Sequence, residues 1–170
     1  QHTFFGTNAY YYFFVLVVFH ALATILFFRL FLYVTTYVNA LIGALFFGFH
    51  PSLWCWFGWI SAQSYHIECL ILLSIILFFY LYFKEKRIIY FWISCLLFFH
   101  NLFLKEQSIF FPVWLLFALP FYNKIFSGSY FPKGSFLKNL FLSIPFFFSS
   151  IIYLGIRLFA MPFSSDTQTL

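Results

Sequence analysis

The stretch YYYFFVLVVFHALATILFFRLFL, residues 10–32, decides the fold class of this protein. Its one charged side chain is Arg29, near the end of the run. A helix needs about 20 mostly apolar residues to cross the hydrocarbon core of a bilayer. The stretch is long enough, and it therefore predicts a membrane-spanning helix.

Composition extends this interpretation to the whole chain. The 170 residues are 64% hydrophobic and only 8% charged, and 32 of them are Phe. An ordinary soluble domain is roughly 25% charged. A soluble fold with this composition would lack the polar side chains needed to cover its surface, whereas lipid accepts apolar surface.

Several further apolar runs follow the first. In lipid each run must satisfy its own backbone hydrogen bonds, so the spans are expected to be helices. We predict an all-α, polytopic transmembrane bundle that forms a single domain over residues 1–170. The six expected spans are residues 10–32, 34–49, 60–83, 88–104, 107–122 and 140–160.

Glycine and proline add local expectations within these spans. Gly43 and Gly48 lie in the second run and indicate close contact with another helix. Pro112, Pro120 and Pro145 are each expected to kink or end a helix, because proline cannot donate a backbone hydrogen bond.

Basic side chains orient the bundle, because they concentrate in cytoplasmic connections. The residues assigned to that side are Arg29, Lys84, Lys86, Arg87, Lys124, Lys133 and Lys138. Lys105 and Arg157 then lie toward the outer side. The first span would begin outside, which leads us to expect at least one further span upstream of residue 1.

Familiar chemical motifs are missing from the sequence. Cys55, Cys69 and Cys95 are spaced irregularly and match no metal or redox pattern. Glycine-rich phosphate loops, G-x-S-x-G and H-E-x-x-H do not occur. Membrane orientation accounts for the basic balance. We therefore predict no metal, no cofactor and no nucleic-acid partner.

Polar groups near the predicted outer ends of the spans are the first candidates for function, because ionisable groups in a bundle are costly. His50 precedes Pro51 and is either a helix terminator at the headgroups or a functional group. Glu68 shares one helical face with Ser61 and Ser64. It either faces a wet cavity that opens outward or is a protonated acid bonded to a neighbouring helix.

A tight turn between two spans holds Lys105 and Glu106 at the outer surface. Lysine is a compact cation suited to phosphate. The pair is therefore either a lipid-phosphate contact or an interfacial ion pair of little energetic value. Trp54, Trp56 and Trp59 fit an aromatic belt at the membrane interface better than a platform for sugar stacking.

Five segments in this order resemble the C-type (GT-C) membrane glycosyltransferases that use polyprenyl-phosphate sugars. They are GTNAYYY (6–12), HALATILFFRL (20–30), ALFFGFHP (44–51), WISAQSYHIE (59–68) and FLKEQSIFFPVWLL (103–116). The similarity is to the branch related to protein O-mannosyltransferases, including members with tetratricopeptide repeats. Many relatives have a charged pair after W-I-S, whereas this chain has Gln63 and Ser64.

The resemblance implies an inverting hexosyltransferase at the outer face of the bacterial inner membrane or the endoplasmic reticulum membrane. Its donor substrate would be a polyprenyl-phosphate sugar, and its other partners would be membrane lipids and a protein or glycan acceptor hydroxyl. The general base of such enzymes is an acidic residue in the first outer loop, which we expect to lie upstream of this chain.

Four residues of this chain match outer-face positions of the family. The resemblance implies catalytic roles for Glu68 and His50, and donor lipid-phosphate binding by Lys105 and Glu106.

A non-enzymatic membrane protein is the alternative: a transporter, a lipid flippase or a structural subunit of a membrane complex. A transporter is expected to show an inverted repeat with paired broken helices, and no such repeat is evident in the sequence. Polar residues gathered on one side of the membrane favour the enzyme.

Overall fold

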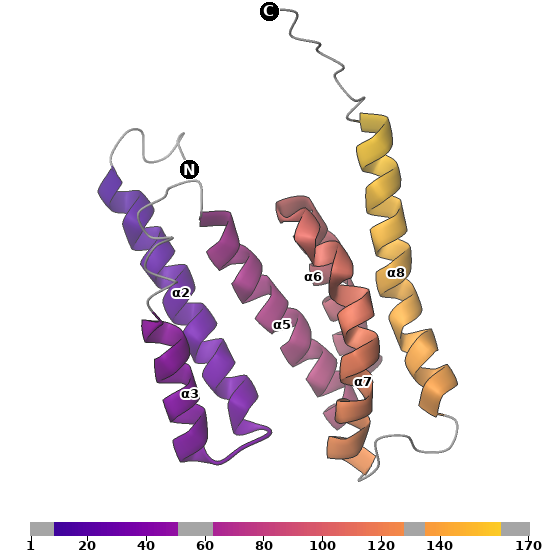
Figure 1. Ribbon diagram of the computed structural model, residues 1–170, viewed down its shortest axis with the longest axis horizontal. Helices are drawn as coiled ribbons and strands as arrows, with labels where there is room; N and C mark the ends of the chain where they lie inside the picture. The colour runs from indigo at the N-terminus through magenta and orange to yellow at the C-terminus, as the bar shows by residue number, and fades with distance from the viewer. Residues whose placement is uncertain (1–8, 51–62, 128–134, 161–170) are drawn as a thin grey trace, which may run out of the picture. The chain divides into compact units, whose positions relative to one another are not determined.

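The computed structural model describes residues 9–50, 63–127 and 135–160 (Figure 1). Nearly all of these residues are helical, which confirms the predicted all-α class. The elements are α2 (Ala9–Leu32), α3 (Tyr37–Phe49), α5 (Gln63–Glu85), α6 (Ile88–Leu104), the 3₁₀ helix η2 (Glu106–Phe110), α7 (Phe111–Ser127) and α8 (Ser135–Ala160).

Four helical stretches of the described chain are long and apolar enough to cross a membrane. They are Tyr10–Leu32, Ser64–Glu85, Glu106–Ile125 and Asn139–Phe159. The other two helices, α3 with 13 residues and α6 with 17, are shorter. Four of the six predicted spans therefore have the length and hydropathy of a membrane-spanning helix, as expected for a multi-pass membrane protein.

The outward-facing side chains also suit lipid. Large apolar groups such as Phe46, Leu96, Phe117 and Phe159 are exposed on α3, α6, α7 and α8. Such extensive apolar exposure would be unfavourable in water but costs nothing against hydrocarbon chains.

The chain divides into two compact units, Gln1–Lys105 and Glu106–Leu170. Within the first unit, α2 packs against α3 and α5, and α5 packs against α6 (Figure 1). Within the second unit, α7 packs against α8 and η2. The boundary falls inside the Lys105–Glu106 turn, so the two residues of the predicted phosphate-binding pair belong to different units.

Small residues bring α2 and α3 together. Ala40, Ala44 and Gly48 recur at every fourth position of α3, and both alanines are buried. A Cβ atom added at Gly48 would lie 3.1 Å from Cγ2 of Thr24 on α2. One added at Gly43 would lie 3.4 Å from another α2 side chain. The predicted close helix contact is confirmed, because small residues let helix backbones approach in membranes.

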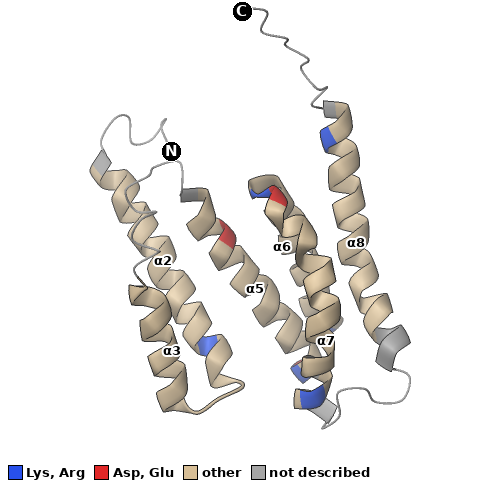
Figure 2. Ribbon diagram, viewed as in Figure 1, with Lys and Arg blue, Asp and Glu red and all other residues tan. Residues whose placement is uncertain are grey.

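The C-terminal ends of α2 and α5 lie side by side. The rings of Tyr33 and Tyr80 stack with their centroids 4.4 Å apart. The Nζ atom of Lys84 lies 5.0 Å from the centroid of the Tyr33 ring. We call this the basic end of the first unit, and its basic residues are Arg29, Lys84, Lys86 and Arg87. Figure 2 shows the basic segment of α2 toward this end, and the acidic segment of α5 near the opposite end of that helix.

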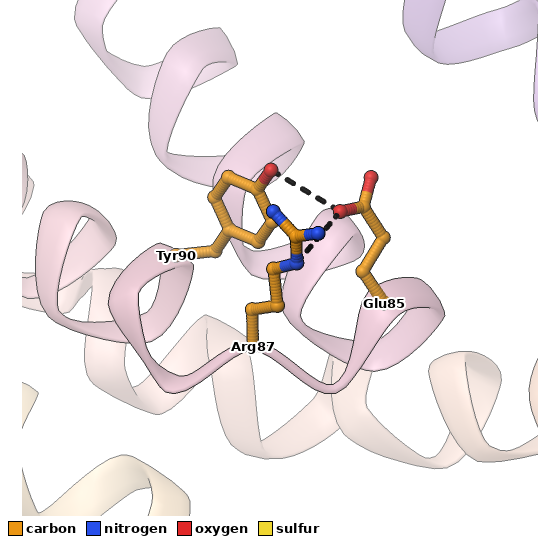
Figure 3. A network of polar contacts seen from close by, with 3 residues as sticks. All are labelled: Glu85, Arg87 and Tyr90. Carbon is orange, nitrogen blue, oxygen red and sulfur yellow. Dashed lines mark hydrogen bonds and ion pairs between the residues drawn. The ribbon is translucent and has the colours of Figure 1, made fainter.

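A two-residue connection joins α5 to α6 at the basic end. Lys86 has a positive φ of 57°, which turns the chain sharply. Nε of Arg87 lies 3.7 Å from Oε2 of Glu85, and the Tyr90 hydroxyl donates to the same oxygen at 3.2 Å (Figure 3). The groups are exposed, so this network adds little stability. The short connection keeps α5 and α6 antiparallel neighbours.

In the second unit, α7 and α8 are joined by a polar contact and an aromatic one. Nδ2 of Asn123 donates to Oδ1 of Asn139 at 3.2 Å, and both side chains are buried. The rings of Phe111 and Phe146 meet at a centroid distance of 5.8 Å. The asparagine pair matters most in lipid, where a polar side chain without a partner is costly.

The three prolines in the described part of the second unit do not end their helices. Pro120 and Pro145 lie inside α7 and α8. Pro112 is the second residue of α7, within the first turn, where a missing N–H is tolerated. Of the two options that the sequence left open, helix termination is therefore wrong for Pro120 and Pro145.

Candidate functional site

Six polar or ionisable side chains in the described part of the first unit lie toward the end of the helices opposite the basic end. We call this group the polar layer. It comprises His20 of α2, Tyr65, His66 and Glu68 of α5, Asn101 of α6, and Lys105 just beyond α6. Three helices therefore contribute side chains to the polar layer.

His20 connects the three helices α2, α3 and α5. Its Nε2 atom lies 3.0 Å from the carbonyl oxygen of Gly48, so this nitrogen carries a proton and donates to the last turn of α3. Its ring meets the His66 ring edge to face, with centroids 5.4 Å apart. Thr24 donates to the carbonyl oxygen of His20 at 2.9 Å, which adds a hydrogen bond within the same helix.

Helix periodicity places Glu68 on the same side of α5 as Ile75, which contacts α6. The Ser94 hydroxyl donates to the carbonyl oxygen of Ile75 at 3.3 Å, which sets the register of this antiparallel pair. Glu68 comes two turns before Ile75, and Asn101 comes two turns after Ser94. Because the two helices are antiparallel, Glu68 and Asn101 lie at about the same level. Glu68 is 8% exposed and Asn101 is fully buried. The predicted site residue is thus a buried carboxyl group with a polar neighbour at its level.

Lys105 is placed by the end of α6. Its backbone N–H donates to the carbonyl oxygen of Asn101 at 3.1 Å, and its own backbone is extended. Its Nζ atom lies over the ring of Tyr65, 3.6 Å from the ring centroid. This is a cation–π contact, because the negative face of an aromatic ring attracts an ammonium group.

Glu106 begins the second unit and has a different partner. Its carboxylate pairs with Nη1 of Arg157 near the end of α8, and the same nitrogen donates to the Tyr153 hydroxyl at 3.4 Å. Lys105 forms no ion pair within the described part of the chain. The adjacent residues Lys105 and Glu106 therefore have separate partners, although the sequence suggested that they act together.

His50 lies directly after α3, as the residue that ends the helix. Its backbone is extended, as the following Pro51 favours. Its ring meets the Phe46 ring edge to face at 5.2 Å. This position fits the predicted place of His50 at the end of a helix. It is two residues beyond Gly48, whose carbonyl oxygen accepts the hydrogen bond from His20.

Several sequence predictions concern residues outside the described ranges. They are the interfacial tryptophans Trp54, Trp56 and Trp59, together with Ser61 and Lys133. Of the four predicted site residues, Glu68 and Lys105 belong to the polar layer, His50 follows α3, and Glu106 lies in the second unit.

Four members of the polar layer were not among the predicted site residues: His20, Tyr65, His66 and Asn101. His20 has a detectable signal, because after the three tyrosines that open the run it is the one ionisable side chain besides Arg29 in residues 10–32. Tyr65 has none, because tyrosine is common near membrane interfaces whatever its role.

Two further observations bear on identity. Among the residues that the structure describes, no group of three or more His, Cys, Asp or Glu side chains is placed to hold a metal ion. No protein-family model, curated protein or solved structure matches the chain.

Proposed function

We propose that this chain acts in an integral membrane glycosyltransferase of the C-type, polyprenyl-phosphate-sugar-dependent class. The enzyme transfers a hexose from its lipid-linked donor to a hydroxyl group of a protein or glycan. The reaction takes place at the outer face of the bacterial inner membrane, or at the equivalent face of the endoplasmic reticulum membrane.

The observation that carries the proposal is the distance of Lys105 from the basic end, which is close to the thickness of the hydrocarbon core of a bilayer. From Tyr65 to Lys84, α5 rises about 28 Å at 1.5 Å per residue. The hydrocarbon core of a bilayer is about 30 Å thick. With the basic end at the cytoplasmic boundary, Tyr65 and Lys105 lie at the outer boundary, at the depth of lipid phosphates.

The proposed reaction is a single displacement at the anomeric carbon of the donor sugar. The acceptor oxygen attacks the anomeric carbon of the sugar, the bond from that carbon to the phosphate oxygen breaks, and the polyprenyl phosphate leaves with the electron pair. The positive charge of Lys105 stabilises the negative charge that develops on the leaving phosphate. A single displacement inverts the anomeric configuration.

The proton of the acceptor hydroxyl passes to an acidic base. The family resemblance assigns this base to the first outer loop of the enzyme. The resemblance also gives catalytic roles to Glu68 and His50 and counts Glu106 among the donor-binding residues. The burial of Glu68 supports a role inside the protein and not at its surface.

The proposal includes six membrane crossings. The 13 residues of α3 and the 17 of α6 rise only about 20 and 25 Å, less than the hydrocarbon thickness of about 30 Å. Short helices are accommodated by local thinning of the bilayer. Such thinning around the first unit would bring lipid phosphates toward Lys105.

Donor binding by the full-length protein in nanodiscs tests the proposal. Loss of a charge-assisted hydrogen bond costs about 1.5–3 kcal/mol, so Lys105→Ala should weaken binding of a polyprenyl-phosphate hexose roughly ten- to a hundredfold. Lys105→Arg should recover part of this loss, because the charge remains while the geometry changes. Acceptor binding should stay the same.

Lys84→Ala is the matched control, because Lys84 also lies over a tyrosine ring, that of Tyr33, but at the basic end of the unit. Its donor affinity should equal that of the parent. Equal donor affinity of Lys105→Ala and the parent would reduce Lys105 to an interfacial anchor. Absence of sugar transfer by the full-length protein with any lipid-linked donor would favour a transporter, flippase or structural subunit.

A further inference from the structure

Three lysines of the first unit lie over aromatic rings, and the pair formed by Lys105 and Tyr65 is the closest of them. Its Nζ-to-centroid distance is 3.6 Å, against 5.0 Å for Lys84 over Tyr33 and 5.5 Å for Lys86 over Phe83. The ammonium group of Lys105 thus touches the face of the ring. Both side chains are half-buried.

The chemical nature of the partner matters for what Lys105 can bind. A carboxylate would neutralise the ammonium charge, whereas a tyrosine ring attracts the cation and carries no net charge. The nearest carboxylate in sequence, that of Glu106, is paired with Arg157 instead. Lys105 therefore keeps its positive charge available for an anionic ligand.

The ring also restricts the side chain. A lysine has four rotatable methylene groups and loses much conformational entropy when a ligand holds its ammonium group. Contact with Tyr65 selects, before any ligand binds, the Lys105 conformers in which Nζ lies over the Tyr65 ring. Pre-organisation of this kind increases affinity, because less freedom is lost on binding.

We propose that Tyr65 is a positioning residue that holds the Lys105 ammonium group ready for the phosphate of a lipid-linked ligand. This inference rests on the proposed function, in which Lys105 binds the donor phosphate. Tyr65 acts through Lys105, and its aromatic ring is the part that matters. The phenolic hydroxyl is not required.

The experiment measures binding of a short polyprenyl phosphate to the full-length protein in phosphatidylcholine nanodiscs. Tyr65→Leu should raise the Kd about three- to thirtyfold, which corresponds to about 0.7–2 kcal/mol at 1.4 kcal/mol per decade. Tyr65→Phe should bind nearly as tightly as the parent, because it keeps the ring. The melting temperature of Tyr65→Phe should be unchanged.

Two controls separate positioning from packing. Tyr33→Leu removes the ring from the comparable pair at the basic end and should leave the Kd unchanged. In a Lys105→Met background, Tyr65→Leu should have little further effect, because the residue through which Tyr65 acts is gone. Competition with inorganic phosphate separates a site for any phosphate from one that requires the lipid.

Each outcome decides the matter. Three results would overturn the inference. Tyr65→Leu could bind as tightly as the parent, or Tyr65→Phe could bind as weakly as Tyr65→Leu. The third is that the parent binds no polyprenyl phosphate. If Tyr65-dependent phosphate binding holds while the full-length protein transfers no sugar, the positioning role stands and the glycosyltransferase proposal fails.

Discussion

Gly48 offers the sharpest test of how the first unit is packed. A Cβ atom at this position would lie 3.1 Å from Cγ2 of Thr24, whereas carbon atoms in favourable contact are about 3.5–4.0 Å apart. The neighbouring helices would therefore have to separate by roughly half an ångström. The hydrogen bond from His20 to the Gly48 carbonyl, now 3.0 Å long, would lengthen with them.

Two opposing effects decide the outcome of Gly48→Ala. Alanine favours the helix over glycine by about 0.5–1 kcal/mol, and overpacking a tight contact costs about 1–3 kcal/mol. We expect the substitution to lower the free energy of unfolding by about 0.5–2 kcal/mol, because the overpacking term is larger. Unfolding in mixed micelles, followed by circular dichroism, measures this difference.

A second substitution identifies the cause. Thr24→Ser removes the obstructing Cγ2 methyl group and keeps the hydroxyl that donates to His20. The double variant Thr24→Ser, Gly48→Ala should therefore regain most of the lost stability. Gly155→Ala is the matched control, because a Cβ atom there meets nothing within 4 Å, and it should be neutral or stabilising. If Gly48→Ala behaves like Gly155→Ala, the close contact between α2 and α3 is refuted.

Four further predictions follow from the structure and the proposal. Lys86→Gly should stabilise the protein by about 0.5–1 kcal/mol, because the left-handed backbone at φ 57° is costly for a residue with a Cβ atom. A free energy of unfolding no higher than that of the parent would contradict this. Asn123→Ala and Asn139→Ala should show a coupling of about 0.6 kcal/mol in a double-mutant cycle of unfolding, and strictly additive effects would exclude their hydrogen bond. Glu68→Gln in the full-length protein should impair sugar transfer with little change in melting temperature, and full activity would remove Glu68 from the site. In a variant without native cysteines, a cysteine at position 52 should react with an impermeant reagent from outside and one at position 86 only from the cytoplasm; labelling of both from one side would rule out six crossings.

The class of the protein and the existence of its helices could be predicted without any tertiary structure. Whether a run such as residues 10–32 is stable in lipid depends on its own length, its own side chains and hydrogen bonds inside the same helix. The grouping of Lys84, Lys86 and Arg87 in one connection is a local property of the same kind. Helix ends near Phe49 and Glu85 were also foreseeable, since Pro51 and a charged connection follow them.

The candidate site could be predicted only in part. Glu68 and Lys105 attract attention because charged groups near or within apolar segments are costly. The partners of these groups were not visible in the sequence: the ring over Lys105 belongs to Tyr65, and Glu106 is paired with Arg157. Chain neighbours were expected to act together, and the structure separates Lys105 from Glu106 into different units.

The amino-acid sequence by itself determined that this is an all-α membrane protein with basic residues at one end of its first helices. Only the tertiary structure decided that His20 reaches Gly48, 28 residues away, and meets His66 on a third helix. The reason is physical. Hydrophobicity and backbone hydrogen bonding are properties of each segment alone. The rotation and register of packed helices depend instead on how the side chains of two helices fit together. Small residues such as Ala40, Ala44 and Gly48 on one helix must match the side chains of the other.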